Sequence, residues 1–268
     1  MTKILVTFGT RKFRFRQTLL VSSALTNKVV DRSERWSVQR LINSGFFQDN
    51  PQFSPHERGA GFWTWKPYVI LDALHSSSPG DLVIYADVGR HDVRLLRVPT
   101  TTLERWMDDH HQDCFPGVEI PWHGPMSQWT KADTFKLLGC ESATFKSAAP
   151  IQASFSVWRN TEQSKSLVQQ WYQGCQDRRI VTDEPNACGT ANEANFVEHR
   201  HDQSILSLIC RKNGLRGLKY PQPYPPAFED RSIEPWLLEL GEPAPVGIKN
   251  QGFGVAATAY GHIEKLLR

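Results

Sequence analysis

Hydrophobic residues lie along the chain in short continuous runs separated by longer stretches of mixed character. Two runs, at 3–9 and 81–87, are rich in β-branched and aromatic residues and end in turn-forming or acidic residues. Runs of this length and composition predict buried strands. A shorter strand is predicted at 29–31, and the apolar–polar alternation at 151–157 predicts one more.

The stretches between these runs place apolar residues three or four positions apart, which is the spacing of an amphipathic helix. Pro67 suits the first turn of such a helix, because that position needs no N–H donor. Gly214 is a typical helix terminator. The predicted helices span residues 14–25, 34–47, 67–74, 101–111, 129–138, 162–172 and 202–213.

Strands that alternate with helices predict an α/β fold with a mostly parallel sheet. In such sheets ligands bind at the carboxyl ends of the strands, which places residues 7–9 and 85–89 at the same edge. A length of 268 residues fits one large domain or two small ones. Seven prolines beyond residue 220 predict that the end of the chain wraps the surface.

The composition narrows the class of protein. Hydrophobic residues make up 40% and charged residues 22%, so a disordered chain or a coiled coil is not expected. No apolar run approaches the roughly 18 residues that span a bilayer, and the first residues lack the apolar core of a signal peptide. The five cysteines include no C-x-x-C pair, as is typical of reduced thiols. We therefore expect a cytoplasmic protein with no transmembrane segment.

Charge is unevenly placed along the chain. Residues 1–66 contain eleven Lys or Arg against four Asp or Glu, whereas the remainder has a small acidic excess. A basic first third fits an anionic ligand, although a solvated basic surface gives the same pattern. A net charge of +3 without a basic–aromatic stretch argues against nucleic-acid binding. The motifs of P-loop kinases, α/β-hydrolases and zincin proteases are missing from the sequence.

The segment RGAGFWTWKPY, residues 58–68, is the first candidate for chemistry. Its two glycines let the backbone approach a ligand closely, and Lys66 stands at the start of a predicted helix. Unpaired N–H groups at a helix start, together with Arg58 and Lys66, are suited to hold a diphosphate. The alternative is a packing loop whose tryptophans are buried, and for Trp63 alone that is the more common outcome.

Asp87 is the second candidate, because it comes at the end of a predicted buried strand. A carboxylate in this place is a candidate ligand for Mg²⁺ or Mn²⁺, which proteins often hold with one or two carboxylates and substrate phosphates. The alternative is that Asp87 only caps the turn after the strand. Its position in the sequence favours neither interpretation.

The segment EHRHDQS, residues 198–204, is the third candidate and leads into a helix with an apolar face. Asp202 or His201 could be the N-cap of this helix. Capping leaves the other polar and charged groups of the segment unexplained. His199 and His201 alternate as a zinc pair would, but no third ligand has suitable spacing. Zinc is therefore the less favoured interpretation.

Taken in order, these segments resemble a family of glycosyltransferases found in capsule, lipopolysaccharide and other surface-glycan gene clusters. The resemblance covers about residues 3–215 and rests on a strand ending in FG, then RGxGxWxWKPY, GDxxxYxDxG, WTK, a Q-x-x-x strand and EHRHDQS. It implies a GT-A-like fold, in which a Rossmann-like domain binds a nucleotide-sugar and is fused to an acceptor-binding C-terminal half. The chain is then one domain, with a donor half at 1–100, an acceptor and catalytic half at 101–215, and a Pro-rich segment at 216–268.

The resemblance also implies roles for particular residues. Asp87 matches the first acid of the DxD metal motif of GT-A enzymes, whereas Gly89 replaces the second. Either Asp87 and two phosphate oxygens hold Mn²⁺ or Mg²⁺, or Lys66 and Arg58 replace the cation. The residues expected to be catalytic are Asp202, His201 and Gln203. Those expected at the donor are Thr7, Phe8, Gly9, Arg58, Gly59, Trp65, Lys66 and Asp87. Those expected at the sugar or the acceptor are Trp63, Lys131, Gln152 and Arg200.

The sequence thus predicts a glycosyltransferase that moves a sugar from a nucleotide-sugar donor, with a UDP-sugar favoured, to a glycan or another hydroxyl acceptor. Positioned cations or a metal would stabilise the charge that develops on the leaving diphosphate. In an inverting enzyme Asp202 is the first candidate base and His201 the second, whereas in a retaining enzyme Asp202 or Gln203 would support the sugar. Two alternatives stay open: a catalytically silent nucleotide- or glycan-binding protein on the same fold, and another phosphate-ester transferase or hydrolase.

Overall fold

The structure is a computed structural model that describes residues 1–88, 95–96 and 99–219. The predictions made for Gly89 and for the Pro-rich segment beyond residue 219 lie outside the described residues.

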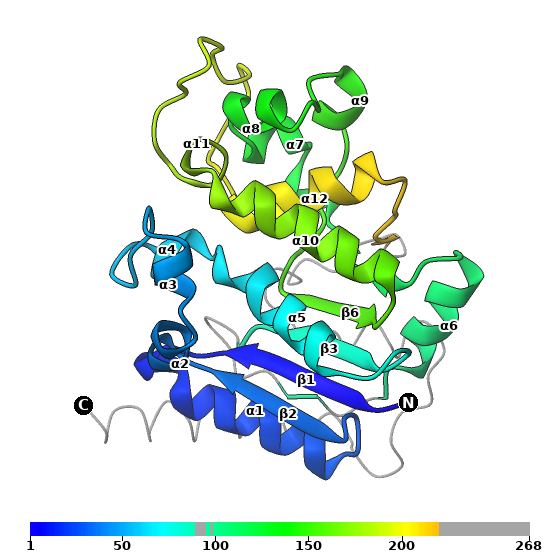
Figure 1. The fold of residues 1–268 in the computed structure, drawn as a ribbon. Helices are drawn as coiled ribbons and strands as arrows, with labels where there is room; N and C mark the ends of the chain where they lie inside the picture. Colours follow the sequence, from blue (N-terminus) through cyan, green and yellow to red (C-terminus); the bar gives the residue numbers. More distant parts are fainter. Residues whose placement is uncertain (89–94, 97–98, 220–268) are drawn as a thin grey trace, which may run out of the picture.

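A five-stranded sheet forms the centre of the described chain (Figure 1). Its strands, in spatial order, are β2 (Arg32–Trp36), β1 (Lys3–Phe8), β3 (Leu82–Ala86), β6 (Phe155–Arg159) and β4 (Cys114–Phe115). β1 is parallel to β2 and β3, whereas β6 is antiparallel to its neighbours β3 and β4. The sheet is therefore mixed and mostly parallel, and the predicted α/β class is confirmed. A two-stranded parallel pair, β5 (Val118–Glu119) and β7 (Leu218–Lys219), lies apart from it.

Helices cover both faces of the sheet and build an upper layer. The α-helices are α1 (Arg14–Thr26), α2 (Val38–Asn43), α3 (Phe46–Asp49), α4 (Gly59–Phe62), α5 (Trp65–Ser76), α6 (Thr101–Asp109), α7 (Met126–Trp129), α8 (Ala132–Leu137), α9 (Ala143–Lys146), α10 (Glu162–Gln176), α11 (Arg178–Val181) and α12 (His201–Lys212). Two 3₁₀ turns, at Arg11–Phe13 and Pro121–His123, complete the elements. In Figure 1 the short helices α7, α8, α9 and α11 lie together above α10 and α12.

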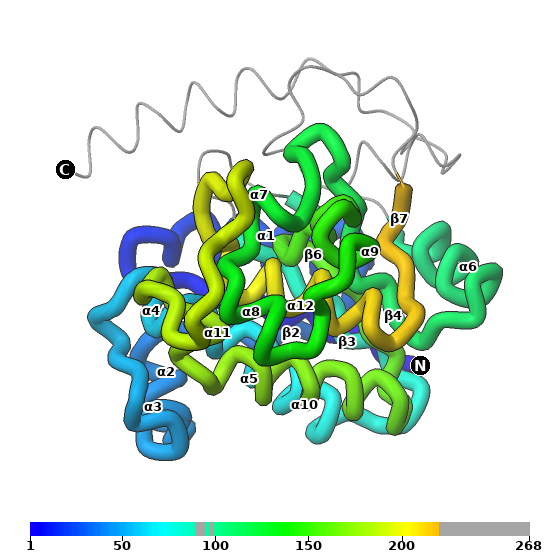
Figure 2. Tube along the Cα trace, turned by 90° about the horizontal axis from the view of Figure 1, so that it is seen from above, coloured from blue at the N-terminus to red at the C-terminus, as the bar shows by residue number. Residues whose placement is uncertain are grey.

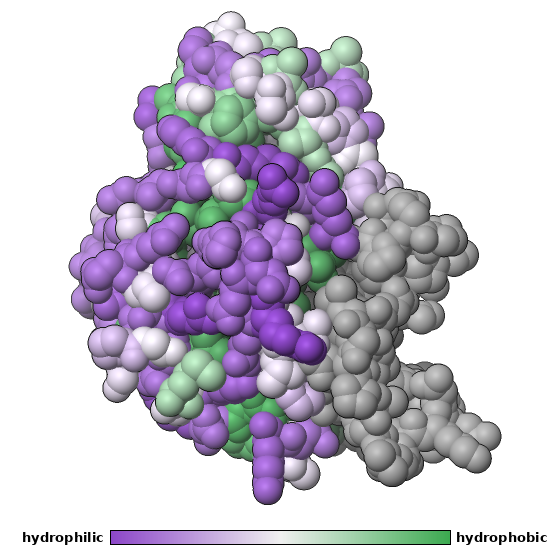
Figure 3. Space-filling model, turned by 90° about the vertical axis from the view of Figure 1, so that its right-hand side faces the viewer, coloured by the Kyte–Doolittle hydropathy of each residue, from purple (hydrophilic) through white to green (hydrophobic). Residues whose placement is uncertain are grey.

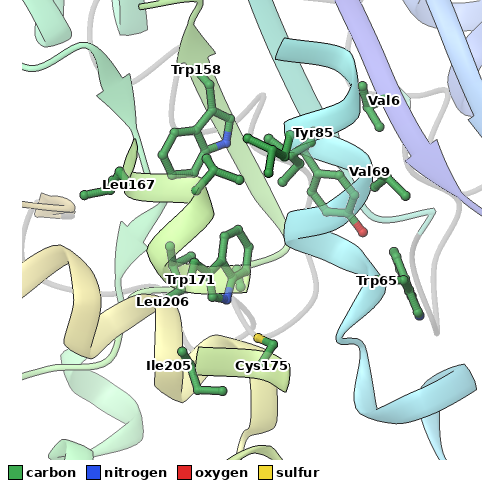
Figure 4. Packing of buried hydrophobic residues seen from close by; sticks show 14 of the residues in the cluster. Val6, Trp65, Val69, Tyr85, Trp158, Leu167, Trp171, Cys175, Ile205 and Leu206 are labelled. Atoms are coloured by element: carbon green, nitrogen blue, oxygen red, sulfur yellow. The ribbon is translucent and has the colours of Figure 1, made fainter. Parts of the chain in front are cut away.

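The two faces of the sheet pack against different helices. On one face, side chains of β1, β3 and β6 pack with α5, α10 and α12. On the other face, alternate side chains of the same strands pack with α1 and α6. Trp158 of β6 and Trp171 of α10 stack at 6.4 Å in the first cluster, and Trp65 and Tyr85 extend it (Figure 4). Packing in the core thus accounts for several of the nine tryptophans.

Two predicted elements need correction. The helix expected at 34–47 is replaced by β2, which ends at Trp36, and by the shorter helices α2 and α3. β2 pairs with β1 along its whole length, so backbone pairing overrides the helical spacing. Ser37 then caps α2 by accepting the N–H of Arg40, and Gly45, with a φ of +85°, separates α2 from α3. The strand expected at 29–31 is β2 itself, shifted toward the C-terminus.

The helix expected at 129–138 is also divided. Thr130 and Lys131 have extended backbone and separate α7 from α8. The strand expected at 151–157 begins later, at Phe155, while Ile151 forms an isolated bridge with Glu119. The predicted helices at 14–25, 67–74, 101–111, 162–172 and 202–213 are confirmed within a few residues.

The carboxyl ends of β1 and β3 lie at one edge of the sheet, where the antiparallel strand β6 begins. The backbone N–H of Asp87 donates to the carbonyl of Ser154 at 2.9 Å, which joins the end of β3 to the start of β6. The predicted meeting of residues 7–9 and 85–88 at this edge is therefore confirmed. Elements that come to the same edge from elsewhere in the chain define the candidate site.

Candidate active site

The backbone before α5 is left-handed. Five consecutive residues, 59–63, have positive φ values from 55° to 93°. Each non-glycine residue in this conformation costs about 1–2 kcal/mol, and three of the five are Ala60, Phe62 and Trp63. Backbone strain of this kind persists where the surrounding structure enforces it, and it concentrates at functional sites. We call residues 59–63 the left-handed turn.

Hydrogen bonds and one close ring contact hold the left-handed turn. Trp65 Nε1 donates to the carbonyl of Gly59 at 2.8 Å, and Thr64 Oγ1 donates to that of Gly61 at 2.7 Å. The Trp63 ring covers Gly59 so closely that a Cβ atom there would lie 2.5 Å from it. Gly59 is therefore needed for its φ and for its lack of a side chain. The glycine expected to admit a ligand makes room for an aromatic ring.

Lys66, on the first turn of α5, directs its ammonium between two carboxylates. Its Nζ lies 2.9 Å from Asp202 Oδ2 and 3.6 Å from Asp87 Oδ1. It also donates to the carbonyl of Ala153 at 3.2 Å. The residue is only 4% exposed, so the charge is compensated within the protein. The three charged groups come from α5, the end of β3 and the start of α12. We call Lys66, Asp87 and Asp202 the charged cluster.

Asp202 is the buried member of the charged cluster. Arg200 is the N-cap residue of α12, and no side chain caps this helix. Asp202 therefore does not have the capping role that was considered for it. The Asp202 carbonyl accepts from Trp171 Nε1 at 2.9 Å, which ties the first turn of α12 to α10. Burial raises the pKa of the Asp202 carboxyl, and the ammonium of Lys66 opposes that rise.

Asp87 is the accessible member. Its side chain is 36% exposed, and Oδ1 accepts the Tyr85 hydroxyl at 2.5 Å. Asp87 thus presents a carboxylate, oriented by Tyr85 and Lys66, at the ligand-binding edge of the sheet. Within the described ranges no three His, Cys, Asp or Glu side chains lie together as a metal site. Asp87 therefore fits a divalent cation only as a single ligand beside phosphate oxygens.

His201 joins the charged cluster to the left-handed turn. It has a positive φ of 48°, and its ring lies 5.2 Å from the Trp63 ring and 5.5 Å from the Phe62 ring. Nδ1 lies 2.8 Å from the Val181 carbonyl, which can only accept, so Nδ1 carries the proton. Burial lowers the pKa of His201 and favours the neutral ring.

Asp183 faces the other nitrogen of this ring. His201 Nε2 lies 3.6 Å from Asp183 Oδ1, and among the described residues Nε2 has no hydrogen-bond partner. Arg58 pairs with the other oxygen of Asp183 at 2.9 Å. Both members of this ion pair are about half exposed, so Arg58 keeps part of its surface for an anionic ligand.

Arg178 fastens the loop that carries the left-handed turn. Its guanidinium donates to the Gln52 carbonyl at 2.6 Å, pairs with Glu57 at 2.9 Å and with Glu184 at 2.5 Å, and lies over the Phe62 ring. These contacts connect residues before the turn to the segment after α11. Neither Arg178 nor Asp183 was expected from the sequence, because no motif or periodic pattern contains them.

Several residues expected at the donor belong to the core. Phe8 and Trp65 stack on each other at 3.8 Å and are 6% and 3% exposed, so they belong to the hydrophobic core. Thr7 is fully buried, and Gly9 donates its N–H to the Trp36 carbonyl and packs on the Gln17 side chain. The packing explanation weighed for the tryptophans thus applies to Trp65.

The charged cluster does not include the remaining predicted residues. Gln203 approaches the N–H of Ala153 at 3.5 Å, close to the carbonyl that Lys66 contacts. Arg200 stacks on the Trp129 ring at 4.5 Å and pairs with Glu198. The Gln152 N–H donates to Val118, away from these groups. Lys131 is 3% exposed and donates to the Glu184 carbonyl at 2.6 Å.

Comparison with known proteins gives distant likenesses. No protein-family model matches the chain, and no curated protein does. The solved structure of mouse xyloside xylosyltransferase 1, apo form, is similar with a TM-score of 0.41 and 12% identity over 81% of this chain and 85% of that one. That of core-mannan synthase A from Aspergillus fumigatus, Mn/GDP form, has a TM-score of 0.34 and 8% identity over 78% of this chain and 69% of that one. Both TM-scores are below 0.5, so the proposals that follow rest on the residues of this chain.

Among the helices of the described residues, none has the length and apolar character needed to cross a bilayer. The face drawn in Figure 3 is mostly hydrophilic, and its hydrophobic atoms form small separate groups.

Proposed function

We propose that the chain is a GT-A-like glycosyltransferase that moves a sugar from a nucleotide-sugar donor, of which a UDP-sugar is the favoured example, to a hydroxyl of a glycan acceptor. The observation that carries this proposal is the charged cluster. Lys66 lies 2.9 Å from the buried Asp202 and 3.6 Å from the accessible Asp87. It stands at the sheet edge where α/β folds bind their ligands, in the segments that carry the sequence resemblance.

The leaving group of such a reaction is a nucleoside diphosphate, so the site must stabilise developing negative charge. Arg58 is about half exposed beside the left-handed turn and is suited to contact the phosphates. Asp87 would be the protein ligand of an Mn²⁺ or Mg²⁺ ion, with the diphosphate oxygens as further ligands. Such an ion, when bound, supplies positive charge at the leaving group.

Asp202 would act at the reacting sugar or at the acceptor hydroxyl. Lys66, which also donates to the Ala153 carbonyl, pairs with this carboxylate at the start of α12. Lys66 favours the ionised form of Asp202, which burial opposes. A fixed, ionised carboxylate suits both a general base and a group that stabilises an oxocarbenium-like transition state. Both roles agree with the geometry, so the proposal includes inverting and retaining outcomes.

Nucleotide binding tests the donor site first. Thermal stability of the chain is measured with UDP, GDP, CDP and ADP, each with and without Mn²⁺. We expect one nucleotide to stabilise the chain selectively, and Asp87→Asn to weaken the metal-dependent part of its affinity by about tenfold. The matched control is Asp108→Asn, since Asp108 is a 60% exposed carboxylate on α6 that pairs with Arg159. A chain that responds to none of these nucleotides overturns the proposal.

Turnover separates an enzyme from a silent binding protein. Hydrolysis of the preferred nucleotide-sugar without acceptor is compared between the unmodified chain and Asp202→Asn. We expect the variant to lose turnover by far more than it loses donor affinity, because the amide keeps the shape of the side chain and removes its charge. Selective donor binding without hydrolysis or transfer by the unmodified chain would favour the binding-protein alternative.

A further inference from the structure

We infer that a second site, next to the charged cluster, binds the acceptor through a neutral, hydroxyl-rich saccharide unit. It is a cavity of about 180 Å³ lined by residues of the segment 182–199 and by Lys131. Figure 2 shows this segment passing beside α7 and α8. The assignment of this cavity to the acceptor rests on the proposed function. The binding of a saccharide to the cavity can be tested without that function.

Buried polar contacts give this cavity a fixed shape. Asp133 is fully buried and accepts the N–H groups of Ala187 and Cys188 at 2.6 and 3.1 Å. Asn192 accepts the N–H of Ala132 at 2.8 Å. Lys131 reaches across to the Glu184 carbonyl at 2.6 Å. The segment has neither helix nor strand, so these contacts replace a regular ladder as its support.

The charges around the cavity disfavour an ionic ligand. Three lining carboxylates each pair with an arginine: Asp183 with Arg58, Glu184 with Arg178 and Glu198 with Arg200. An anionic ligand would face all three carboxylates, and a cationic ligand would compete with the three arginines. The Lys131 ammonium also lines the cavity, but it is 3% exposed, donates to the Glu184 carbonyl and lies near the carboxylates of Asp183 and Glu184, so its charge is already engaged.

The lining also supplies what a sugar requires. Carboxylate oxygens accept hydrogen bonds from hydroxyl groups, and the Phe196 ring offers an apolar surface for the face of a sugar. Pockets for drug-sized ligands hold about 300–1,000 Å³. The smaller volume of this cavity therefore fits a single monosaccharide unit.

Asp183 connects the cavity to the charged cluster. It lines the cavity, and its Oδ1 lies 3.6 Å from His201 Nε2, one residue before Asp202. In the neutral ring with its proton on Nδ1, both facing atoms are hydrogen-bond acceptors. A hydroxyl of the acceptor supplies the donor that His201 Nε2 lacks within the described residues. A saccharide bound here has a hydroxyl directed toward the proposed reaction centre.

Direct binding of sugars tests the site without the reaction. Saturation-transfer NMR is recorded with glucose, galactose, mannose and N-acetylglucosamine, and with glucuronic acid and glucosamine as charged comparisons. Each sugar is tested with and without the preferred nucleotide and Mn²⁺, in case the donor must bind first. We expect at least one neutral sugar to bind, and Asp183→Asn and Phe196→Ala each to weaken its binding by about tenfold.

The matched control is Glu193→Gln. Glu193 lies in the same segment and pairs with Lys146 at 2.8 Å, but it does not line the cavity. Thermal melts of the three variants identify any that fail to fold. The inference is overturned if no neutral sugar binds in any state, if the charged sugars bind better, or if Glu193→Gln weakens binding as much as Phe196→Ala does.

Failure of this inference differs from failure of the proposed function. A chain that binds a nucleoside diphosphate but no neutral sugar keeps its donor site and loses this acceptor site. A chain that binds a neutral sugar in the cavity but no nucleotide keeps a saccharide site and loses the transferase proposal.

Discussion

Lys66 and Lys131 are two buried lysines with opposite surroundings. They are 4% and 3% exposed, and each follows a tryptophan by one or two positions in the sequence. Lys66 lies between the carboxylates of Asp202 and Asp87. Lys131 donates to the Glu184 carbonyl and forms no ion pair within the described residues. Burial lowers the pKa of Lys131, because nearby carboxylates offset its loss of hydration only in part.

The difference separates the proposed reaction centre from a structural contact. A lysine between two carboxylates brings opposite charges together at the place where we propose that a nucleotide-sugar binds. A lysine on a carbonyl positions a segment of backbone, here the one that lines the proposed acceptor cavity. Equal burial of the same side chain therefore does not imply the same role. The group that the ammonium contacts decides the role of the lysine.

Removal of the Lys66 charge is expected to have the largest effect. Lys66→Met leaves Asp202 buried without its cation, and loss of one partner of a buried ion pair costs about 3–5 kcal/mol. Urea unfolding at neutral pH measures this loss. The double variant Lys66→Met/Asp202→Asn removes the remaining charge and should recover part of the stability. Equal losses in the single and the double variant would mean that the unpaired charge of Asp202 is not the cause of the destabilisation.

The left-handed turn that leads to Lys66 should be the next most sensitive place. Gly59→Ala puts a Cβ atom 2.5 Å from the Trp63 ring at a φ of +63°, so steric overlap adds to backbone strain and we expect a loss of about 2–4 kcal/mol. Gly80→Ala is the control, since Gly80 has a φ of +83° with open space around it, and only about 1 kcal/mol is expected. Similar losses at both positions, measured by urea unfolding, would show that the Trp63 contact is unimportant.

Lys131→Met should have the smallest effect at neutral pH. It removes one hydrogen bond to the Glu184 carbonyl, for which we expect a loss of about 1–2 kcal/mol. Because the pKa of Lys131 is lowered from 10.5 in the folded chain, the unfolded chain binds more protons between the two values. The unfolding free energy of the unmodified chain should therefore rise, relative to the variant, as pH increases toward 10.5, by at most about 1.4 kcal/mol per pH unit.

Urea unfolding of both proteins at several alkaline pH values measures that difference. A gap that stays constant with pH would mean that Lys131 is as well solvated in the folded chain as in the unfolded one.

The two apolar strands of the sheet were predictable from the sequence. β1 and β3 are short β-rich runs that are buried on both faces. Strands of this kind are continuously apolar, so they can be recognised from the local sequence alone. The edge strand β2, with the sequence RSERW, carries no such pattern, and it forms because its backbone pairs with β1. Edge strands need only one partner and can stay polar, which removes the signal that sequence reasoning uses.

The residues of the candidate site also divide into those that the local sequence predicts and those that only tertiary contacts place. Lys66, Asp87 and Asp202 were each expected at a site, because each stands at the end or start of a predicted element. Asp183 was missed, since the segment 182–199 has no periodicity and is held beside His201 by tertiary contacts, among them those of Asp133 and Asn192. Phe8 and Trp65 were expected at the ligand but stack in the core, because an aromatic residue in a motif is as good at packing as at binding.

The sequence by itself determined the α/β class, the strands that end at the ligand-binding edge, and which charged residues stand at the ends of elements. These features follow from local periodicity and from residues that start or stop helices and strands. Only the tertiary structure decided that Lys66 meets Asp202 while Lys131 meets a carbonyl, and that five residues before α5 turn left-handed. These contacts and this backbone conformation depend on partners that lie far away in the sequence. Their free energy is that of burying a charge or a strained backbone beside such a partner.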